Sequence, residues 1–431
     1  MVRNICEIEL PALFPAEFFW GAATAAHQIQ GSPNSNWGQW ERSKARIEDL
    51  KSRGLNVSVY ISGNGCEMES RYYKKDLELA RALSHNAHRF GINWATVEPE
   101  RGVFDTNILK RYANIMTYAR ECGIEPFVTL YWWTHPAWFE RMGSWKHQDS
   151  PALFARFVAE VMKYIGDIVD YYPLLNEINV YAGMSFRWGE FPPHEHDERV
   201  WTTVIQNLLE AHRRAYPVIK SRNSRARVGI SHAANWQEAV DPAALADIYA
   251  WNFEPIDQLL PYLDWIGLNT YMHIADKSSL VPILSGADPC TTEPVISDSG
   301  WGMCPRAMGE ILKEFSKKYT LPLIITEHGH SVAEIDDRRR CWYLWESLKW
   351  IHQAMQKGAD LRGYLHWSLM DNFEWAEGYA KKFGLLHIDR TTMRRTPRTS
   401  AYLLRDIIAA GGLTQEIADT YRSAIRHPLA V

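Results

Sequence analysis

Long apolar runs are absent from this 431-residue sequence. No stretch approaches the ~20 consecutive apolar residues that a membrane-spanning helix needs, and the first residues, MVRNICEIEL, lack the apolar core of a secretion signal. The sequence also lacks a cluster of basic residues. Its net charge is −4, and Lys and Arg are scattered among Asp and Glu. We therefore expect a cytoplasmic protein that binds neither a membrane nor nucleic acid.

Motifs for redox, cofactor or metal chemistry are scarce, and we expect neither a cofactor nor a metal. The six cysteines include no CxxC pair, which is typical of reduced thiols in a cytoplasmic protein. The stretch SGNGC lacks the third glycine of a dinucleotide-binding loop. The stretch HEHD (residues 194–197) precedes a helical pattern, so we expect a solvated capping loop rather than a metal site. The basic run Arg338–Arg340 is interpreted as a solvated helix face.

Aromatic residues, in contrast, are abundant, with 19 Trp and 20 Tyr. Bulky aromatic side chains usually pack in the core. This many of them, several close to polar residues, also fits sugar binding, because ring faces stack on the C–H surfaces of a sugar while polar neighbours bind its hydroxyls. The overall composition, 46% hydrophobic and 23% charged, is that of a globular protein with a large core.

Strand-like and helix-like stretches alternate along nearly the whole chain. We expect eight strands, at Phe18–Ala26, Asn86–Trp94, Ile124–Trp133, Pro173–Ile178, Ala226–His232, Trp265–Tyr271, Leu321–Glu327 and Arg362–Leu369. Strands that alternate with helices indicate a parallel sheet with right-handed crossovers. No linker divides the eight units, so the pattern predicts one (β/α)8 barrel domain over residues 1–431, with its chemistry where strands end and βα loops begin.

The clearest helical pattern runs from Pro151 to Val169, with apolar residues at a spacing of three to four. We expect Ser150 to be its N-cap and Pro151 to occupy its first position. Further helices are expected at about 109–122, 198–220, 306–319 and 338–357.

Two glutamates stand at the ends of strand-like stretches. Glu327 follows the apolar run LIIT, and Glu177 follows LLN, at the ends of the seventh and fourth expected strands. Parallel strands place both on the same face of the barrel, and two facing carboxylates in a chain rich in Trp fit glycoside hydrolysis. The alternative for either one is a solvated loop residue or a charge at the start of a helix.

Several longer motifs resemble glycoside hydrolase family 1, the retaining β-glycosidases that include β-glucosidases and β-galactosidases. The resemblance spans about residues 14–389. It runs through FPAEFFWGAATAAHQIQG, NAHRFGINWATVEPERGVFD, LLNEIN, GLNTY, ITEHG and GYLHWSLMDNFEWAEGYAKKFGLLHID.

The resemblance implies a role for each matching residue. Glu177 would be the acid/base and Glu327 the nucleophile, with Arg89 keeping Glu327 ionised and Tyr271 orienting it. The substrate would be a small β-glycoside or oligosaccharide that ends in glucose, galactose or fucose. Its binding residues would be Asn176 at the 2-hydroxyl, Gln28, Glu374 and Trp375 at the outer hydroxyls, Trp367 against the ring, and Trp132 below the sugar. Without the resemblance, Glu374 would be interpreted as a helix N-terminal acid and Trp367 as a core residue.

Several positions depart from the family pattern. The Asn-Glu-Pro motif has become Asn176-Glu177-Ile178, and the asparagine after the nucleophile has become His328. Most importantly, Trp132 stands where many members carry a histidine that binds the 3-hydroxyl of the sugar. Both glutamates are retained, so these departures concern sugar preference rather than mechanism. Whether Trp132 faces the sugar or turns into the barrel core stays open.

Other functions remain possible from the sequence. A non-catalytic sugar-binding barrel is one, but the presence of both glutamates disfavours it. A 6-phosphoglycosidase is another, but a carboxylate at Glu374 would repel a phosphate. A transglycosylase uses the same intermediate as a hydrolase, so the sequence does not separate these two.

Overall fold

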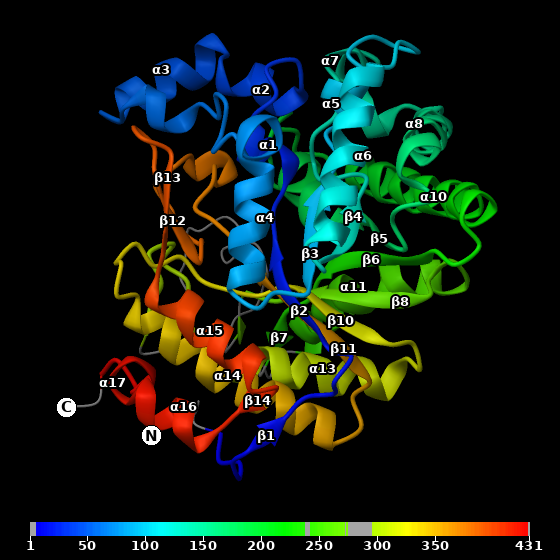
Figure 1. The fold of residues 1–431 in the computed structure, drawn as a ribbon. Coiled ribbons are helices and arrows are strands. Elements are labelled where there is room, and N and C mark those ends of the chain that lie inside the picture. The colour runs from blue at the N-terminus through cyan, green and yellow to red at the C-terminus, as the bar shows by residue number, and fades with distance from the viewer. Residues whose placement is uncertain (1–5, 238–241, 272, 275–294, 430–431) are drawn as a thin grey trace.

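Eight parallel strands close into a barrel. The computed structural model describes residues 6–237, 242–271, 273–274 and 295–429. Within them the barrel strands are joined in the order β10-β11-β2-β3-β4-β5-β6-β8 (Figure 1). Their bounds are β2 (Phe19–Ala23), β3 (Ala87–Gly91), β4 (Glu125–Thr129), β5 (Tyr171–Asn176), β6 (Arg227–Ala233), β8 (Trp265–Asn269), β10 (Leu323–Glu327) and β11 (Leu361–Trp367). Each of the eight expected strands overlaps one of these, which confirms the predicted (β/α)8 barrel.

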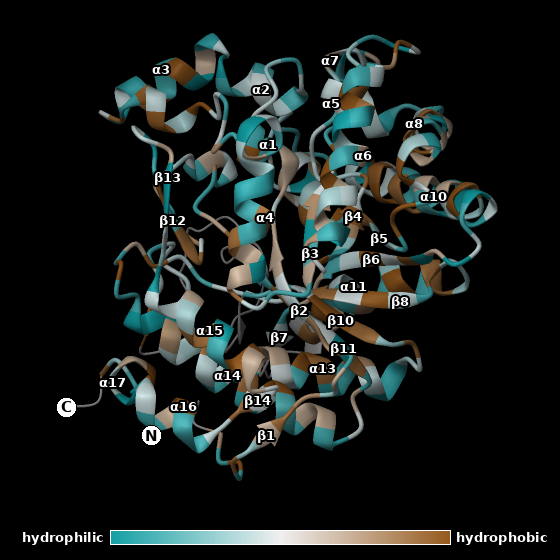
Figure 2. Ribbon diagram, viewed as in Figure 1, coloured by the Kyte–Doolittle hydropathy of each residue, from teal (hydrophilic) through white to brown (hydrophobic). Residues whose placement is uncertain are grey.

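A long helix follows each barrel strand and packs outside the sheet (Figure 1). In chain order these helices are α4 (Tyr73–Ala82), α6 (Thr106–Glu121), α8 (Ser150–Ile165), α10 (Glu198–Arg222), α11 (Pro242–Leu259), α13 (Arg306–Lys318), α14 (Arg338–Gln356) and α15 (Thr399–Ala409). The five helices expected from the sequence are all present. Figure 2 shows the hydropathy of these elements, with polar residues frequent on the outer helices.

Short elements fill the loops between the strands and the helices. The helices among them are α1 (Ala26–Gln30), α2 (Asn36–Glu41), α3 (Lys44–Ser52), α5 (Trp94–Val97), α7 (Ala137–Arg141), α9 (Ile178–Ala182), α16 (Gln415–Thr420) and α17 (Arg422–Ile425). Three two-stranded sheets pair β1 (Ala12–Leu13) with β14 (Gly412–Leu413), β12 (Leu386–Asp389) with β13 (Arg394–Pro397), and β7 (Trp236–Gln237) with β9 (His273–Ile274). The first of these pairs joins the beginning and the end of the chain.

A layer of bulky side chains fills the barrel near the start of its strands. Phe127, Trp265, Ile324 and Leu365 are buried there, and Phe19 packs against them. Side chains alternate along a strand, so the positions two residues later point the same way, nearer the strand ends. Arg89, two residues after the buried Ala87 of this layer, is one such position. The layer therefore forms a floor beneath the carboxyl ends of the strands.

The predicted start of helix α8 is wrong by one residue. Ser150 is the first helical residue rather than the N-cap, and Asp149 takes the N-cap position without a side-chain cap. The chain already turns before this point, because the Ser150 N–H donates to the His147 carbonyl oxygen at 3.0 Å. The helix also ends at Ile165, and Val169 is buried beyond its end.

The interpretation of Arg338–Arg340 as a solvated face is also wrong. The Arg338 side chain is exposed, but Arg340 is fully buried and forms an ion pair with Asp337 at 2.7 Å. Consecutive helical residues point about 100° apart, so three in a row cannot share one solvated face. The prediction for HEHD is confirmed as a cap, because the Asp197 side chain accepts hydrogen bonds from the N–H groups of Arg199 and Val200.

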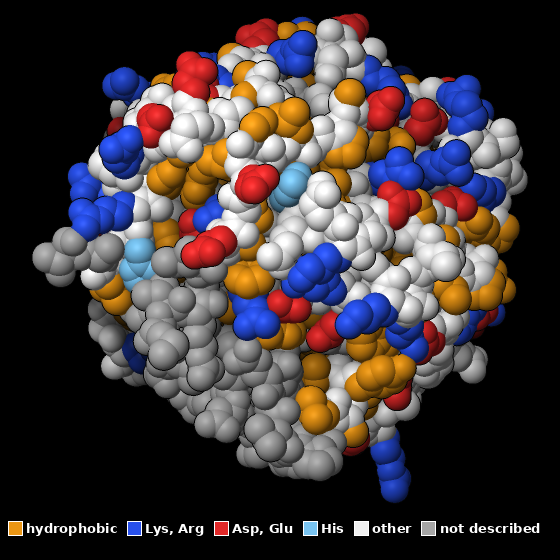
Figure 3. All heavy atoms as spheres, turned by 90° about the horizontal axis from the view of Figure 1, so that it is seen from below, with side chains coloured by type: hydrophobic (Ala, Val, Ile, Leu, Met, Phe, Trp, Pro, Cys, Tyr) orange, Lys and Arg blue, Asp and Glu red, His pale blue; other side chains and the backbone are white. Residues whose placement is uncertain are grey.

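Charges of both signs are interspersed over the face drawn in Figure 3. In the part of the chain that the structure describes, no helix has the length and apolar character to cross a bilayer. No cluster of three or more His, Cys, Asp or Glu side chains in the same residues could hold a metal ion. Four cysteines, Cys6, Cys66, Cys122 and Cys341, are free thiols, and Cys290 lies outside the described residues.

Candidate active site

A cavity of about 450 Å³ opens at the carboxyl ends of the barrel strands. The strand ends and the loops after them supply its walls, as the fold predicts for a functional site. Arg89 lies within β3, and Asn176 is the last residue of β5, directly before Glu177. Eight of the ten residues expected to form the site line the cavity, namely Gln28, Trp132, Glu177, Tyr271, Glu327, Trp367, Glu374 and Trp375. Arg89 and Asn176 contact these residues from behind.

Glu327 is the last residue of β10 and is held by two donors. Arg89 Nη1 donates to its Oε1 at 2.7 Å, and the Tyr271 hydroxyl donates to its Oε2 at 2.7 Å. The glutamate is only 4% exposed, so its charge depends on these partners rather than on water. Both oxygens of Glu327 are thereby fixed, which sets the orientation of the carboxylate in the cavity.

Arg89 is fully buried and is fixed on every side. Besides Glu327, its Nη2 donates to Asn176 Oδ1 at 2.6 Å and its Nε donates to Thr129 Oγ1 at 2.9 Å. The guanidinium carbon lies 3.8 Å from the centroid of the Trp132 ring, a cation–π contact. This arginine therefore connects the strand end of Glu327 to that of Glu177 through Asn176.

Glu177 follows β5 and has neutral partners. Asn269 Nδ2 donates to its Oε1 at 2.9 Å, and Asn176 Nδ2 donates to its Oε2 at 3.4 Å. Its backbone lies in the left-handed region, with φ 44° and ψ 56°, which few residues other than glycine adopt. Such strain is tolerated where the surroundings hold the residue firmly, and it is frequent at functional sites.

The two carboxyls are electrostatically distinct. Burial, reinforced by the nearby charge of Glu327, raises the pKa of Glu177 to about 8. Burial also raises the pKa of Glu327, but there the Arg89 guanidinium and the Tyr271 hydroxyl oppose the rise. Of the two carboxyls, only Glu327 has a direct contact with a cation, so the negative charge is favoured there. At neutral pH this arrangement places the proton on Glu177 and the negative charge on Glu327.

Gln28 and Glu374 form a polar wall on the outer side of the cavity. Gln28 Nε2 donates to Glu374 Oε2 at 3.2 Å and to Asn372 Oδ1 at 3.1 Å. Gln28 Oε1 is buried, and the described residues offer it no hydrogen-bond donor. Burial, followed by the charges of Glu327 and Glu377, raises the pKa of Glu374 to about 8. An unsatisfied acceptor beside a carboxyl is suited to receive the hydroxyls of a bound sugar.

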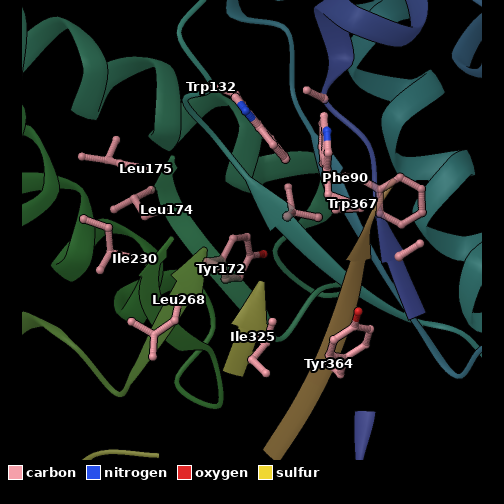
Figure 4. Close-up of a cluster of buried hydrophobic side chains, with 14 of the residues drawn as sticks. Phe90, Trp132, Tyr172, Leu174, Leu175, Ile230, Leu268, Ile325, Tyr364 and Trp367 are labelled. Carbon is pink, nitrogen blue, oxygen red and sulfur yellow. The ribbon is translucent and has the colours of Figure 1, made fainter. Parts of the chain in front are cut away.

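Tryptophans form the remaining walls. The rings of Trp132 and Trp367 lie 5.5 Å apart, and Figure 4 shows them side by side. Trp133 packs on Trp375 with ring centroids 4.8 Å apart. Trp132 is almost fully buried and packs in the core cluster, and it also lines the cavity. Trp367 also lines the cavity, so its interpretation as a core residue alone is incomplete.

Some residues of the site were not found from the sequence. Asn269 ends β8 and binds Glu177, Thr129 ends β4 and binds Arg89, and the Trp133 Nε1–H donates to the Asn176 carbonyl oxygen at 3.1 Å. Asn372 anchors Gln28. The available signal for Asn269 and Thr129 was their position as polar residues at strand ends, the same signal that identified the two glutamates.

Comparisons with known proteins agree with this geometry. The family model of glycosyl hydrolase family 1 matches residues 10–260 and 253–413. Beta-glucosidase A of Acetivibrio thermocellus is 28% identical over 452 residues, which cover 93% of this chain and 99% of the relative. The beta-galactosidase of Saccharolobus solfataricus is 29% identical over 94% of this chain and 96% of the relative.

Solved structures show the same relationship. The beta-glycosidase from Pyrococcus horikoshii superposes with a TM-score of 0.85 at 27% identity, covering 98% of this chain and all of that chain. The beta-glucosidase from Thermotoga maritima in complex with deoxynojirimycin gives a TM-score of 0.82 at 27% identity, covering 93% and 99% of the two chains. The chain belongs to glycosyl hydrolase family 1, and it is a retaining β-glycosidase.

Proposed function

We propose that Glu327 is the nucleophile and Glu177 the acid/base of a β-glycosidase that releases a terminal sugar. The observation that carries this assignment is the difference in their partners. Glu327 contacts a guanidinium and a phenol hydroxyl, which stabilise its negative charge. Glu177 contacts two neutral amides, which leave it protonated and able to donate.

Two displacements complete the reaction. In the first, the Glu327 carboxylate attacks the anomeric carbon while the bond from that carbon to the aglycone oxygen breaks. The Glu177 proton moves to this oxygen, so the aglycone leaves as an alcohol. In the second, the Glu177 carboxylate takes a proton from water, whose oxygen attacks the anomeric carbon and displaces Glu327. Both residues then return to their starting protonation states.

The remaining residues of the site are proposed to hold the sugar. Asn176 would bind its 2-hydroxyl, Gln28, Glu374 and Trp375 its outer hydroxyls, and Trp367 its ring. The orphaned Gln28 Oε1 beside Glu374 supports this placement. We propose glucose, galactose or fucose as the terminal sugar, and the names of the relatives, beta-glucosidase and beta-galactosidase, support the first two.

The stereochemistry of the product tests the double displacement. Each displacement inverts the anomeric carbon, so two in succession return the β-configuration. NMR of a nitrophenyl β-glucoside reaction should therefore show the β-anomer of glucose first, with the α-anomer growing only at the rate of mutarotation. An early α-anomer would instead require a single displacement by water, and Glu327 would then act as a base.

A separate prediction concerns Trp132. An indole has one N–H donor, whereas an imidazole can donate or accept, and the Trp132 ring is occupied by Arg89 and Trp367. We therefore expect weak recognition of the 3-hydroxyl. A 3-deoxy β-glucoside should lose less than ~1 kcal/mol of transition-state binding, the lower range for one neutral hydrogen bond, measured as the ratio of kcat/KM values.

Two variants sharpen this test. Trp132→His restores a ring that can accept a hydrogen bond, and it should enlarge the 3-deoxy penalty. Trp132→Phe keeps a ring over Arg89 without a donor, and it should leave the penalty as small as in the parent. A parent enzyme that already loses several kcal/mol with the 3-deoxy substrate would contradict this account of Trp132.

We further propose that residues 1–431 act as one domain in the cytoplasm. The closed barrel includes strands from β2 to β11, and the pairing of β1 with β14 ties the ends of the chain to it. The free thiols of Cys6, Cys66, Cys122 and Cys341 support a reducing compartment.

A further inference from the structure

Arg398 forms a buried ion pair beneath the polar wall of the cavity. It follows β13, and its side chain is fully buried. Its Nη1 donates to Asp371 Oδ1 at 3.0 Å and its Nη2 donates to Asp371 Oδ2 at 3.0 Å. This two-pronged geometry fixes the direction of the carboxylate as well as its distance. Asp371 begins the segment 371–375, which carries Glu374 and Trp375 into the cavity.

The surroundings of Asp371 are tightly packed. Its carboxylate also accepts from the Gly384 N–H at 3.1 Å and from His387 Nδ1 at 3.2 Å. The Gly384 carbonyl oxygen accepts from Arg398 at 2.8 Å and from Arg340 at 3.0 Å. A Cβ on Gly384 would lie 2.1 Å from the Asp371 nitrogen, so the two backbone segments touch. Movement at Arg398 is therefore transmitted to Asp371 rather than absorbed.

Single hydrogen bonds, rather than a helix or a sheet, hold the segment that follows. Residues 371–374 belong to no helix or strand. Beyond Asp371, further hydrogen bonds hold the segment. The Phe373 N–H donates to the Gln28 carbonyl oxygen at 3.1 Å, and Asn372 Nδ2 donates to Ser368 Oγ at 3.0 Å. Glu374 lies three residues after the Asp371 anchor. Its own N–H donates to the Gly378 carbonyl oxygen at 2.6 Å, so the Asp371 anchor on one side and Gly378 on the other place it in the cavity.

We propose that Arg398 is a positioning residue for sugar recognition. Through Asp371 it fixes segment 371–375 and thereby holds the Glu374 carboxyl at the outer hydroxyls of the sugar. This inference rests on the proposed role of Glu374. Arg398 lies behind the cavity wall and touches neither substrate nor the reacting carboxyls, so its effect falls on selectivity at one end of the sugar.

The substitution Arg398→Lys tests this inference. Lysine keeps the positive charge, so Asp371 is not left unpaired, but an ammonium cannot form the two-pronged contact. A shift of about 1 Å in a group that positions substrate can cost about 10² in rate. We therefore expect the segment to move and the Glu374 contact to weaken.

The measurement is the ratio of kcat/KM for a nitrophenyl β-glucoside to that for its 4-deoxy and 6-deoxy analogues. Arg398→Lys should reduce this ratio by about threefold or more. This is a fraction of the roughly 10²-fold loss of rate that a 1 Å misplacement can produce. The corresponding ratio for the 2-deoxy analogue should stay within about twofold of the parent, because Asn176 is held by Arg89 at the other end of the cavity.

Arg395 offers a matched control. Its Nε and Nη2 donate to the two carboxylate oxygens of Asp76 at 2.9 Å and 3.0 Å, and this pair is equally buried. The Arg395–Asp76 pair does not include segment 371–375. Arg395→Lys should lower the Tm by a similar amount to Arg398→Lys and leave the 4-deoxy and 6-deoxy ratios unchanged. Equal changes in the ratios for both variants, or no change for Arg398→Lys, would overturn the inference.

Glu374→Gln separates this inference from the proposed function. If Glu374→Gln leaves the outer-hydroxyl ratios unchanged, the proposed role of Glu374 fails, and the inference fails with it. If Glu374→Gln reduces them and Arg398→Lys does not, the inference alone fails. Should Arg398→Lys not fold, Asp371→Asn removes the same contact from the other side, and its ratios decide in the same way.

Discussion

Replacing Glu327 by glycine should reduce turnover of a nitrophenyl β-glucoside by on the order of 10⁴-fold or more, as expected when a covalent nucleophile is removed. No carboxylate then remains beside Arg89 and Tyr271 to attack the anomeric carbon. The floor of the barrel and the polar wall are untouched by the change, so the variant should still bind substrate. The check is kcat for the parent and the variant under the same conditions, with circular dichroism to show that the fold is retained.

Three further measurements interpret this result. Glu327→Gln keeps the size of the side chain and an acceptor for Arg89, and it should be as inactive as the glycine variant. Azide can enter the space left in Glu327→Gly and attack from the side of the missing carboxylate, giving an α-glycosyl azide. Glu190→Gln, at an exposed carboxylate of the cavity rim with no proposed role, should keep most of the activity. Near-parental turnover by Glu327→Gln would rule Glu327 out as the nucleophile.

The fold could be predicted from the sequence because its signal is repeated. Eight apolar stretches alternate with helical patterns, and each overlaps a barrel strand. The boundaries were less accurate. The expected strand Ile124–Trp133 ends in the structure at Thr129, because Trp132 and Trp133 leave the sheet and line the site. Periodicity cannot separate a buried strand from a buried loop, since both are apolar.

The reacting residues could be predicted, but their supports could not. Glu177 and Glu327 stand at strand ends, where a charge has a chemical use. Asn269 and Thr129 stand at strand ends as well, but their contacts with the Glu177 carboxyl and the Arg89 guanidinium follow only from the three-dimensional structure. The direction of the Trp132 side chain was open from the sequence and follows from its packing against Arg89 and Trp367.

Buried arginines were the clearest failure of sequence reasoning. Arg340 belongs to the run that we expected to be solvated, and Arg398 belongs to a second basic stretch for which we made no prediction; both are fully buried. Asp337, three residues earlier in the chain, neutralises Arg340, and Asp371, distant in sequence, neutralises Arg398. Charge patterning along the chain reports local repulsion, whereas burial is decided by partners that the fold brings in.

Glu177→Ala should have an effect that depends on the leaving group. Loss of general acid catalysis costs about 10²- to 10⁴-fold for aglycones that need a proton, such as alkyl β-glucosides. A dinitrophenyl β-glucoside has an acidic leaving group and needs little help, so its first displacement should change by less than about tenfold. The second displacement lacks its base, so the glycosyl-enzyme should accumulate and kcat and KM should fall together for this substrate.

Azide distinguishes the acid/base from the nucleophile. In Glu177→Ala, azide needs no base, and it should attack the accumulated glycosyl-enzyme from the face that water normally uses. The product should be a β-glycosyl azide, and kcat should rise with azide concentration. An α-glycosyl azide from this variant would mean that the two roles are reversed.

The pH profile supplies an independent test of the same residue. Glu177 must be protonated for the first displacement, and its surroundings raise its pKa to about 8. The kcat/KM of the parent should therefore be retained below this value and lost as the pH rises through it. In Glu177→Ala with the dinitrophenyl substrate, the alkaline fall should disappear, because no proton donor remains to titrate. If the fall persists unchanged in the variant, another group, such as Glu374 with its similarly raised pKa, controls it, and the assignment of Glu177 as the acid loses this support.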